Sequence, residues 1–487
     1  MNPKLTRRSE TENHSTAGRA PAALRPPTST RRSFLKGLGC GALSATPLLG
    51  TLAHLGSVTT AAAQSIPPGN DYRALVCILL AGGNDSYNMI VPHEVDEYAD
   101  YLAARSDLAL DRDELLVVSP PGIGRDFGFH PNMPEAKAIF DAGRLAVINN
   151  VGTLVEPVTL AGVESGAARL PLGLYSHSDQ IRQWQTSVPD DRQALGWGGR
   201  MADLLAGFNS TSEISMGISL SGTNDFQSGA MSREFAITTD GSTGIIGFGD
   251  PDPVLALRET ALRSMIDRQY KNLLELAFTQ TLSAGIRNDE VFSAAIAGAA
   301  DLDMLFSPAP LSQSLRMIAE TISVRESLGL RRQTFFVLVG GWDHHDEVLA
   351  AQAPMLGGVS LALSEFDAAL ASLGVRDDVT TFTISDFGRT LTSNGRGSDH
   401  GWGGNALVMG GAVQGGDFYG TPPPLFPGNP LDTGRGRLIP TLSTDEYFAE
   451  LALWFGVTLG DLDGVLPNIG RFWNPSLVDP PVGFLLG

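Results

Sequence analysis

The sequence predicts an α/β protein with a doubly wound, mostly parallel sheet and helices on both faces. Several short apolar runs lack regular polar alternation, which is typical of strands buried on both faces. Longer segments between them repeat their apolar residues with a helical period. Strands that alternate with helices favour a parallel sheet covered on both sides. The expected strands span residues 73–80, 145–149, 214–220, 334–339, 380–384 and 406–409, and the expected helices span 180–186, 253–282, 313–328 and 348–373.

The first 63 residues are expected to be an export signal that is not part of the fold. Residues 30–36, Thr-Arg-Arg-Ser-Phe-Leu-Lys, are similar to a twin-arginine signal, and a mildly apolar stretch and Ala61–Ala63 follow. The alternative is an ordinary disordered basic N-terminus. Glycines and a proline interrupt the apolar stretch, so no stable membrane anchor is expected. We therefore expect export by the twin-arginine machinery, maturation near Ala63 and a periplasmic or extracellular location.

The expected mature chain is strongly acidic. The whole sequence has 34 Lys and Arg residues and 53 Asp and Glu residues, and residues 1–63 hold eight and two of them, which leaves 26 and 51, a formal charge of −25. This charge disfavours nucleic acid or an anionic membrane as the main partner. An anionic substrate would need local positive charge from a metal or an arginine. Cys77 alone remains after loss of Cys40, so no intramolecular disulfide is expected.

Residues 64–487 are expected to form a single domain. No Pro/Ser-rich linker or charge run divides them, and the polar clusters described next are spread from residue 81 to residue 404. The segment 222–249, rich in Gly, Ser, Thr and Asp, is expected to be an irregular excursion or hairpin beside the site. Residues 422–430, with five prolines, predict another extended loop.

Four polar clusters stand next to predicted strands. In open α/β sheets the carboxyl ends of parallel strands lie along one edge, where ligands bind. We therefore expect the clusters to form one site, and their carboxylates and imidazoles suit a divalent metal. The clusters are Ala-Gly-Gly-Asn-Asp-Ser at 81–86, Gly-Gly-Trp-Asp-His-His-Asp at 340–346, Ser-Asp-Phe-Gly-Arg at 385–389 and Ser-Asp-His-Gly-Trp-Gly-Gly at 398–404.

The first two clusters supply three candidate metal ligands. Asp85 follows two glycines that allow a tight turn near a cation, although Gly-Gly-Asn-Asp is also typical of a plain turn. Asp343 and His345 lie on the same side of an extended backbone, so both can reach one ion. His344 would then point away from the ion, towards a carboxylate that does not itself bind the metal. The alternative for this cluster is a hydrated surface loop.

The other two clusters add Asp386, Arg389 and His400. Asp386 is a candidate ligand and Arg389 a fork-shaped donor for a bound phosphate or sulfate, but the pair is also compatible with a structural salt bridge. His400 lies in a glycine-rich loop whose backbone can approach a ligand closely. We expect His400 to bind a metal, and a purely structural histidine is the alternative.

A Ser-His segment precedes a predicted helix and is the candidate nucleophile segment. Ser176 and His177 come before the helix expected at 180–186. A hydroxyl at a helix N-terminus sits where the dipole and free N–H groups stabilise developing negative charge. The alternative is that Ser178 or Asp179 simply caps the helix.

Together these motifs resemble the DUF1501 family of exported bacterial proteins. The resemblance rests on the twin-arginine signal, the strand ending in Gly-Gly-Asn-Asp, the Ser-His segment, the Asp-His cluster, the Ser-Asp-Phe-Gly-Arg segment, Gly-Trp-Gly-Gly-Arg at 196–200 and residues 398–404. It covers residues 72 to about 473. Departures from the family pattern are Trp342, His344, Asp386 in place of the usual Glu, and Ser178 in place of an aromatic residue.

The resemblance implies a distant branch of the alkaline phosphatase and sulfatase superfamily, with one or two divalent ions at the strand ends. The implied ligands, in chain order, are Asp85, Asp343 with His345, Asp386 and His400. Phe387 stands where a further ligand is expected, and no superfamily-type nucleophile motif is present. Ser176 is a nucleophile candidate by position only.

Two functions are compatible with these residues. The first is an exported hydrolase of phosphate or sulfate esters, of small molecules or glycans, that depends on Zn, Mn, Mg or Ca. Asp343, His345 and His400 would hold its metal, and Asp85 and Asp386 would hold a second ion or orient the site. Arg389 would neutralise the ester oxygens, and Ser176 or His177 would attack or relay a proton. The second is a non-catalytic, metal-stabilised protein that binds an extracellular glycan or protein.

Overall fold

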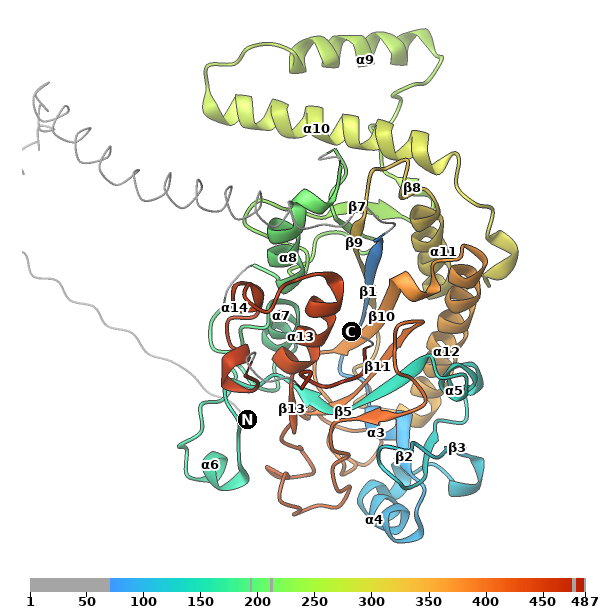
Figure 1. Ribbon diagram of the computed structural model, residues 1–487, viewed down its shortest axis with the longest axis vertical. Coiled ribbons are helices and arrows are strands. Elements are labelled where there is room, and N and C mark those ends of the chain that lie inside the picture. Colours follow the sequence, from blue (N-terminus) through green and yellow to red (C-terminus); the bar gives the residue numbers. More distant parts are fainter. Residues whose placement is uncertain (1–70, 193–194, 211–212, 475–478, 486–487) are drawn as a thin grey trace, which may run out of the picture. The chain divides into compact units, whose positions relative to one another are not determined.

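The computed structural model describes residues 71–192, 195–210, 213–474 and 479–485. The expected export signal, residues 1–63, lies outside the described residues. The central sheet has the strand order β12-β5-β11-β10-β1-β9-β6-β7-β8, with β13 beside β5 (Figure 1). Its strands are β1 (Arg73–Leu80), β5 (Leu145–Gly152), β6 (Gly217–Ser219), β7 (Phe235–Thr238), β8 (Gly241–Ser242), β9 (Arg332–Val339), β10 (Val379–Ser385), β11 (Gly404–Gly410), β12 (Phe418–Tyr419) and β13 (Leu442–Ser443).

Most neighbouring strands are parallel, as the sequence predicts. β1 lies between β9 and β10 and is parallel to both. Its alternate residues enter different cores, with Val76 and Ile78 on one face and Cys77 and Leu79 on the other. This two-sided burial explains the continuous apolar run, and it makes Cys77 a buried free thiol.

Strand β11 departs from the parallel arrangement. It runs antiparallel to β10 and to β5. Its first residue therefore lies at the edge where β10 ends, and the segment 398–404 that leads into it reaches the same edge. An antiparallel strand thus delivers the fourth polar cluster to the carboxyl ends of the parallel strands.

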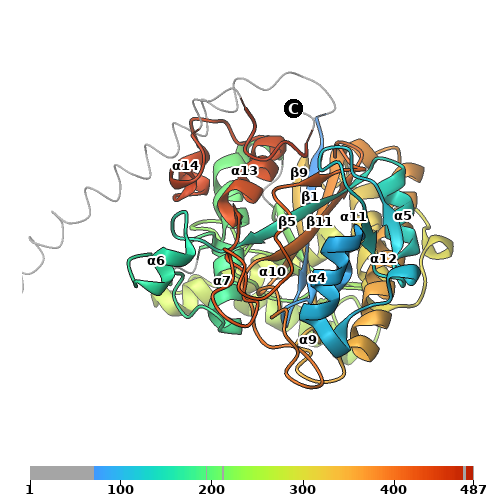
Figure 2. The ribbon, with the colours of Figure 1, turned by 90° about the horizontal axis from the view of Figure 1, so that it is seen from below.

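Helices cover both faces of the sheet (Figure 2). One face packs against α5, α11 and α12, and the other packs against α7, α8, α13 and α14. Among the described helices, α12 is long and apolar enough to span a membrane by length and composition. Here it lies against α5 and α11. These helices are α5 (Pro134–Asp141), α7 (His177–Thr186), α8 (Trp197–Leu205), α11 (Pro310–Ser323), α12 (Val348–Ser372), α13 (Thr444–Phe455) and α14 (Leu462–Val465).

The remaining elements flank the sheet. A small antiparallel sheet has the order β2-β4-β3. The predicted excursion at 222–249 contains the β7–β8 hairpin. The single helix expected at 253–282 is wrong, because the chain turns between residues 267 and 272 and forms two helices, α9 and α10. The elements are β2 (Ile90–Pro92), β3 (Leu116–Val118), β4 (Phe127–Phe129), α3 (Ser86–Met89), α4 (Val95–Arg105), α6 (Leu160–Glu164), α9 (Pro253–Ile266) and α10 (Leu273–Ile296).

The first turn of α13 contains a fully buried carboxyl group. Burial raises the pKa of Asp445 to about 8, against the opposing influence of Ser187 and Arg200. In the unfolded chain an Asp carboxyl titrates near pH 4. The folded protein therefore keeps this proton between about pH 4 and pH 8, whereas the unfolded chain loses it, so this group's contribution to stability falls as the pH rises through that range.

Replacing Asp445 with Asn should therefore stabilise the protein increasingly with pH. We expect the gain in unfolding free energy to grow by roughly 1 kcal/mol per pH unit between pH 5 and pH 7.5. Urea unfolding at several pH values measures it. The exposed Asp463→Asn variant is the control, with a pH-independent change of at most about 0.5 kcal/mol. A pH-independent difference for Asp445→Asn would contradict the buried-carboxyl account.

Candidate metal centre

The candidate site lies where three central strands end side by side. Leu80, the last residue of β1, pairs with Ser385 at the end of β10 and with Val339 at the end of β9. The loops that follow these strands carry the first three polar clusters. The segment before β11 brings the fourth cluster beside them, and Arg389 and His400 form an isolated antiparallel bridge.

Three histidines and one aspartate meet at this edge. His400 Nε2 lies 2.9 Å from His345 Nε2 and 3.0 Å from His177 Nε2. Carboxylate oxygens of Asp343 lie 3.0 Å from His345 Nε2, 3.3 Å from His400 Nε2 and 3.5 Å from His177 Nε2. One donor atom from each of His177, Asp343 and His400 lies within 4.8 Å of the others, as in a site that could hold a metal ion.

The opposite nitrogen of each ring faces an oxygen acceptor. His177 Nδ1 lies 2.6 Å from Asp386 Oδ2, and His345 Nδ1 lies 3.1 Å from Asp399 Oδ1. His400 Nδ1 lies 2.8 Å from the carbonyl oxygen of Tyr175. A neutral His400 ring that donates from Nδ1 to the Tyr175 carbonyl keeps its lone pair on Nε2, and the same tautomer of His177 and His345 donates to Asp386 and Asp399 and leaves their lone pairs on Nε2.

In this tautomer the Nε2 lone pair of His400 faces those of His177 and His345, and the Asp343 carboxylate lies beside them. Acceptors at such distances repel unless a cation or a proton lies between them. Burial lowers the pKa of His400, although the Tyr175 carbonyl raises it, which favours the neutral ring. Three imidazole nitrogens with one carboxylate oxygen form a donor set suited to a metal such as zinc, whereas magnesium and calcium prefer oxygen.

Asp343 is held in place by Arg389. The guanidinium Nη1 lies 2.7 Å from Asp343 Oδ1. Burial would raise the pKa of Asp343, but Arg389 and the neighbouring histidines lower it, and the net direction is down. Arg389 is itself buried and also donates to the carbonyls of Gly82 and Ser398. Arg389 therefore supports the candidate ligand Asp343, and its guanidinium contacts protein groups at both terminal nitrogens.

Asp386 lies behind the cluster, not among the facing Nε2 atoms. Its Oδ1 accepts from the Gly82 N–H at 3.0 Å, and its Oδ2 faces His177 Nδ1. Burial raises its pKa, whereas the Gly82 and His177 contacts lower it. In this position Asp386 orients the His177 ring, as carboxylates behind metal-bound histidines commonly do.

Asp85 lies apart from the four converging side chains, in a fully buried ion pair with Arg105 at the end of α4. Ser398 Oγ is a further contact, 3.3 Å from Asp85 Oδ2. The guanidinium of Arg105 thus stands where the sequence suggested a metal cation. No motif marks Arg105, because its partner is 20 positions away and in another element, so sequence reasoning missed it.

Tyr175 and Ser176 directly precede α7 and lie beside the histidines. Ser176 is the residue before the helix, and its Oγ lies 3.3 Å from Ser178 Oγ. The alternative that Ser178 or Asp179 caps the helix does not hold, because Ser176 is the N-cap residue and both lie inside the first turn. Tyr175 has a φ of 72°, an unfavourable angle for a side-chain-bearing residue, and this turn aims its carbonyl at His400.

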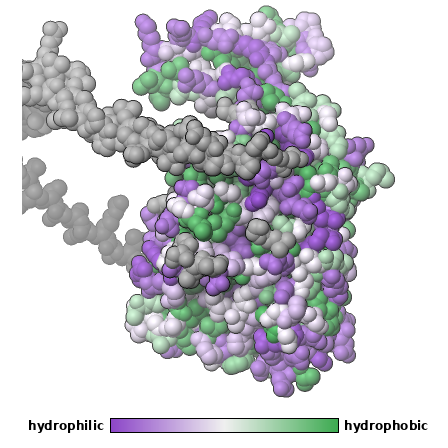
Figure 3. All heavy atoms as spheres, in the orientation of Figure 1, coloured by the Kyte–Doolittle hydropathy of each residue, from purple (hydrophilic) through white to green (hydrophobic). Residues whose placement is uncertain are grey.

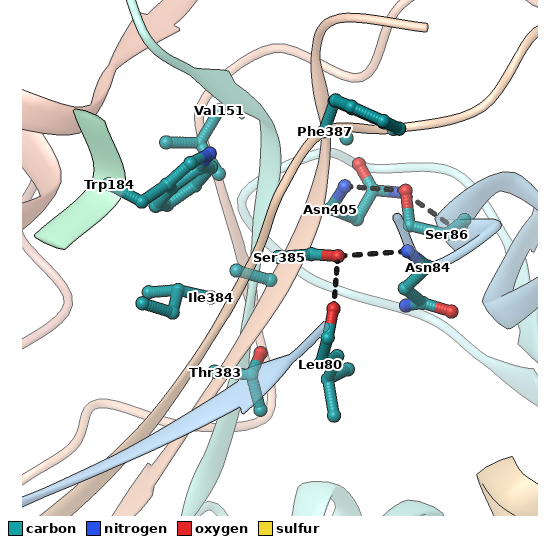
Figure 4. Close-up of a pocket in the computed structure, with 13 residues that line it drawn as sticks. Leu80, Asn84, Ser86, Val151, Trp184, Thr383, Ile384, Ser385, Phe387 and Asn405 are labelled. Carbon is teal, nitrogen blue, oxygen red and sulfur yellow. Dashed lines mark hydrogen bonds between the residues drawn. The ribbon is translucent and has the colours of Figure 1, made fainter. Parts of the chain in front are cut away.

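The Phe387 ring packs against the rings of His177 and His400. Its ring centroid lies 4.8 Å from that of His177 and 4.6 Å from that of His400. Phe387 also lines the small pocket shown in Figure 4, where hydrogen bonds connect the ends of β1 and β10. Ser385 Oγ donates to the Leu80 carbonyl and accepts from the Asn84 N–H. Phe387, which stands where the resemblance implied a further metal ligand, therefore supports the two histidines by ring contact and offers no donor atom.

Most of the sequence matches a known family model. Residues 72–427 match the model described as "Protein of unknown function (DUF1501)". The chain belongs to the DUF1501 family. The resemblance inferred from the motifs is thereby confirmed. No curated protein matches the sequence.

Several solved structures have a low similarity to this chain, both in sequence identity and in TM-score. Ps i-CgsB in complex with k-i-k-neocarrahexaose has 10% identity and a TM-score of 0.33, over 83% of this chain and 77% of that one. The soluble domain of lipooligosaccharide phosphoethanolamine transferase A from Neisseria meningitidis has 9% identity and a TM-score of 0.33, over 82% and 95%. The C-terminal periplasmic domain of EcEptC from Escherichia coli, in complex with Zn, has 11% identity and a TM-score of 0.31, over 86% and 93%. These similarities are too low to indicate an activity for this DUF1501 protein.

Replacing Arg105 with Met should strongly destabilise the protein, because it leaves the Asp85 carboxylate buried without a counter-charge. We expect a loss of about 3–5 kcal/mol in the free energy of unfolding, measured by urea denaturation. The double variant Asp85→Asn, Arg105→Met removes both charges and should recover much of that loss. A loss below about 1 kcal/mol for Arg105→Met would contradict the buried pair.

Replacing Asp386 with Asn should weaken metal binding, because one amide oxygen cannot accept from both Gly82 and His177 as the carboxylate does. We expect a 10- to 100-fold loss of zinc affinity, measured by competition with a chromophoric chelator. Asp346→Asn is the matched control, since Asp346 is exposed and forms an ion pair with Arg396. Equal affinities for Asp386→Asn and the unchanged protein would rule out this orienting role.

Proposed function

We propose that this DUF1501 protein is an exported, metal-dependent hydrolase of phosphate or sulfate esters. The observation that supports it most is the convergence of His177, His345, His400 and Asp343, with each ring held through its other nitrogen. A set of acceptors fixed in this way is arranged for a cation.

The proposed ion is a single zinc or a similar transition metal, held by these four side chains. Such an ion would polarise an ester oxygen and lower the pKa of a bound water. His177 is then a ligand and is no longer a candidate nucleophile. Asp85 is already neutralised by Arg105, so a second ion at Asp85 is not part of the proposal.

The N-terminus of α7 supplies the other element of the proposal. The helix has no side-chain cap, so N–H groups of its first turn are available to a ligand. The helix dipole and these donors favour the non-bridging oxygens of a phosphate or sulfate group. They also provide local positive character in a chain whose net charge would repel an anion.

Ser176 or a water molecule is the proposed nucleophile. Ser176 adjoins the ligand His177 and stands at the open end of α7. A hydrogen bond from Arg192 lowers the pKa of the neighbouring Asp179, and contact with Ser176 lowers it further. Burial opposes this shift only in part, so the net direction is down. Asp179 is therefore an ionised acceptor close to the Ser176 hydroxyl. Attack by Ser176 would form an Oγ–phosphorus or Oγ–sulfur bond and break the ester bond, while the hydroxyl proton would pass through Asp179 to the departing alcohol. Water would then hydrolyse the Ser176 ester.

Turnover of aryl phosphates and aryl sulfates by the zinc-loaded protein tests the proposal. We expect hydrolysis of one class, its loss after chelation and its recovery with added metal. His400→Ala should reduce kcat/KM by at least about 100-fold, more than the loss of a residue that only orients a metal ligand usually does. His130→Ala is a control, since His130 is a buried histidine whose Nδ1 accepts from the Asn132 N–H. Metal-loaded protein without turnover on a broad ester panel would overturn the proposal.

A non-catalytic, metal-stabilised binding protein is the second candidate. One observation favours it: the donors of Arg389, the expected partner of the ester group, already contact Asp343, Gly82 and Ser398. In this case Ser176→Ala would leave ligand binding unchanged, and metal would raise the melting temperature without any turnover. Affinity for a polysaccharide measured by calorimetry would then identify the function.

A further inference from the structure

The α9–α10 hairpin has an apolar face that nothing in the described chain covers. None of the residues of α9 is buried, and α10 buries only Ile286 and Phe292 among its 24 residues. Helices of this kind gain most of their stability by packing an apolar face. The labels in Figure 1 show α9 alongside α10 and farther than α10 from β7 and β8.

The contact between the two helices fixes which side of α9 is open. Arg263 of α9 bonds Glu259 in its own helix and Glu290 of α10, with Nη2–Oε1 distances of 2.7 and 2.6 Å. This ion-pair side of α9 therefore faces α10. The face drawn in Figure 3 has apolar atoms among polar ones over the hairpin.

The opposite side of α9 carries a stripe of apolar residues, here called the α9 stripe. It consists of Val254, Leu257, Ala261 and Met265, whose intervals of three and four residues place them on one helical face. Val254, Leu257 and Met265 are 67%, 69% and 52% exposed. A helix that is apolar on two sides is normally buried on both.

The charges of the hairpin favour a second copy of this chain as the partner. Residues 251–300 carry five basic and six acidic side chains, so this segment is close to neutral in a strongly acidic protein. An interfacial membrane helix usually has a Lys/Arg-rich polar face, which α9 lacks. The stripe is also flanked by opposite charges, with Asp250 before α9 and Arg268 after it, both exposed.

We propose that two copies of this protein associate through their α9 stripes in an antiparallel, two-fold arrangement. In that arrangement Leu257 and Ala261 of one copy lie near Ala261 and Leu257 of the other. Arg268 of each copy then meets Asp250 of its neighbour, because the end of one helix lies beside the start of the other. A single 14-residue helix buries a small area, so the dimer is weak, with a Kd on the order of micromolar.

Sedimentation velocity of the purified protein over a range of concentrations tests this proposal. The unchanged protein should shift from monomer to dimer, and Leu257→Lys with Met265→Lys should remain monomeric. Met304→Lys is the matched control, because Met304 is 96% exposed and lies outside the α9–α10 hairpin.

A charge exchange tests the antiparallel register. Arg268→Glu and Asp250→Arg should each weaken self-association at least tenfold, whereas an equimolar mixture of the two variants should dimerise as well as the unchanged protein. In the mixed pair both contacts join opposite charges, whereas each variant alone brings like charges together.

Three results would overturn the proposal. They are a monomer at every concentration, a dimer that survives the two stripe substitutions, and binding to phospholipid vesicles that the same substitutions abolish. Thermal melting of each variant, within a few degrees of the unchanged protein, separates lost association from lost folding. A mixture of charge variants that stays monomeric would overturn the register alone and leave the stripe to the first experiment.

Discussion

The candidate site depends on the orientation of three imidazole rings. An oxygen acceptor faces each Nδ1, so the neutral His400 ring directs its Nε2 lone pair at the Nε2 atoms of His177 and His345, with the Asp343 carboxylate beside all three. Such an arrangement is unfavourable by itself, because acceptors repel at about 3 Å. It becomes favourable when a cation accepts all the lone pairs together. The surrounding protein, including Arg389, Asp386 and the strained Tyr175, maintains this convergence.

The sheet places the starting points of these segments side by side. The ends of β1, β9 and β10 are in register, so residues that follow them start from neighbouring positions. The reversed direction of β11 adds the segment with His400, and the start of α7 adds His177. The fold thus explains why donors separated by more than 200 positions share one site, for example His177 and His400.

Much of this arrangement was predictable from residue patterns. β1 was predicted over its whole length, because continuous apolar runs and the following glycines mark a buried parallel strand clearly. The same rule places Asp343 and Asp386 at one edge. The partners of the charged groups were not predictable. Arg105 pairs with Asp85 from another element, and the turn between α9 and α10 interrupts a pattern that reads as one helix.

The central claim is that the facing Nε2 atoms bind one transition metal. X-ray absorption spectroscopy of the zinc-loaded protein tests it most directly, since the shell of scatterers reports ligand type and distance. The account predicts one zinc per chain, with about three imidazole nitrogens and one carboxylate oxygen at roughly 2.0–2.2 Å. His177→Ala should remove one imidazole from that shell. A protein that retains no stoichiometric metal, or a shell of oxygen atoms alone, would contradict the account.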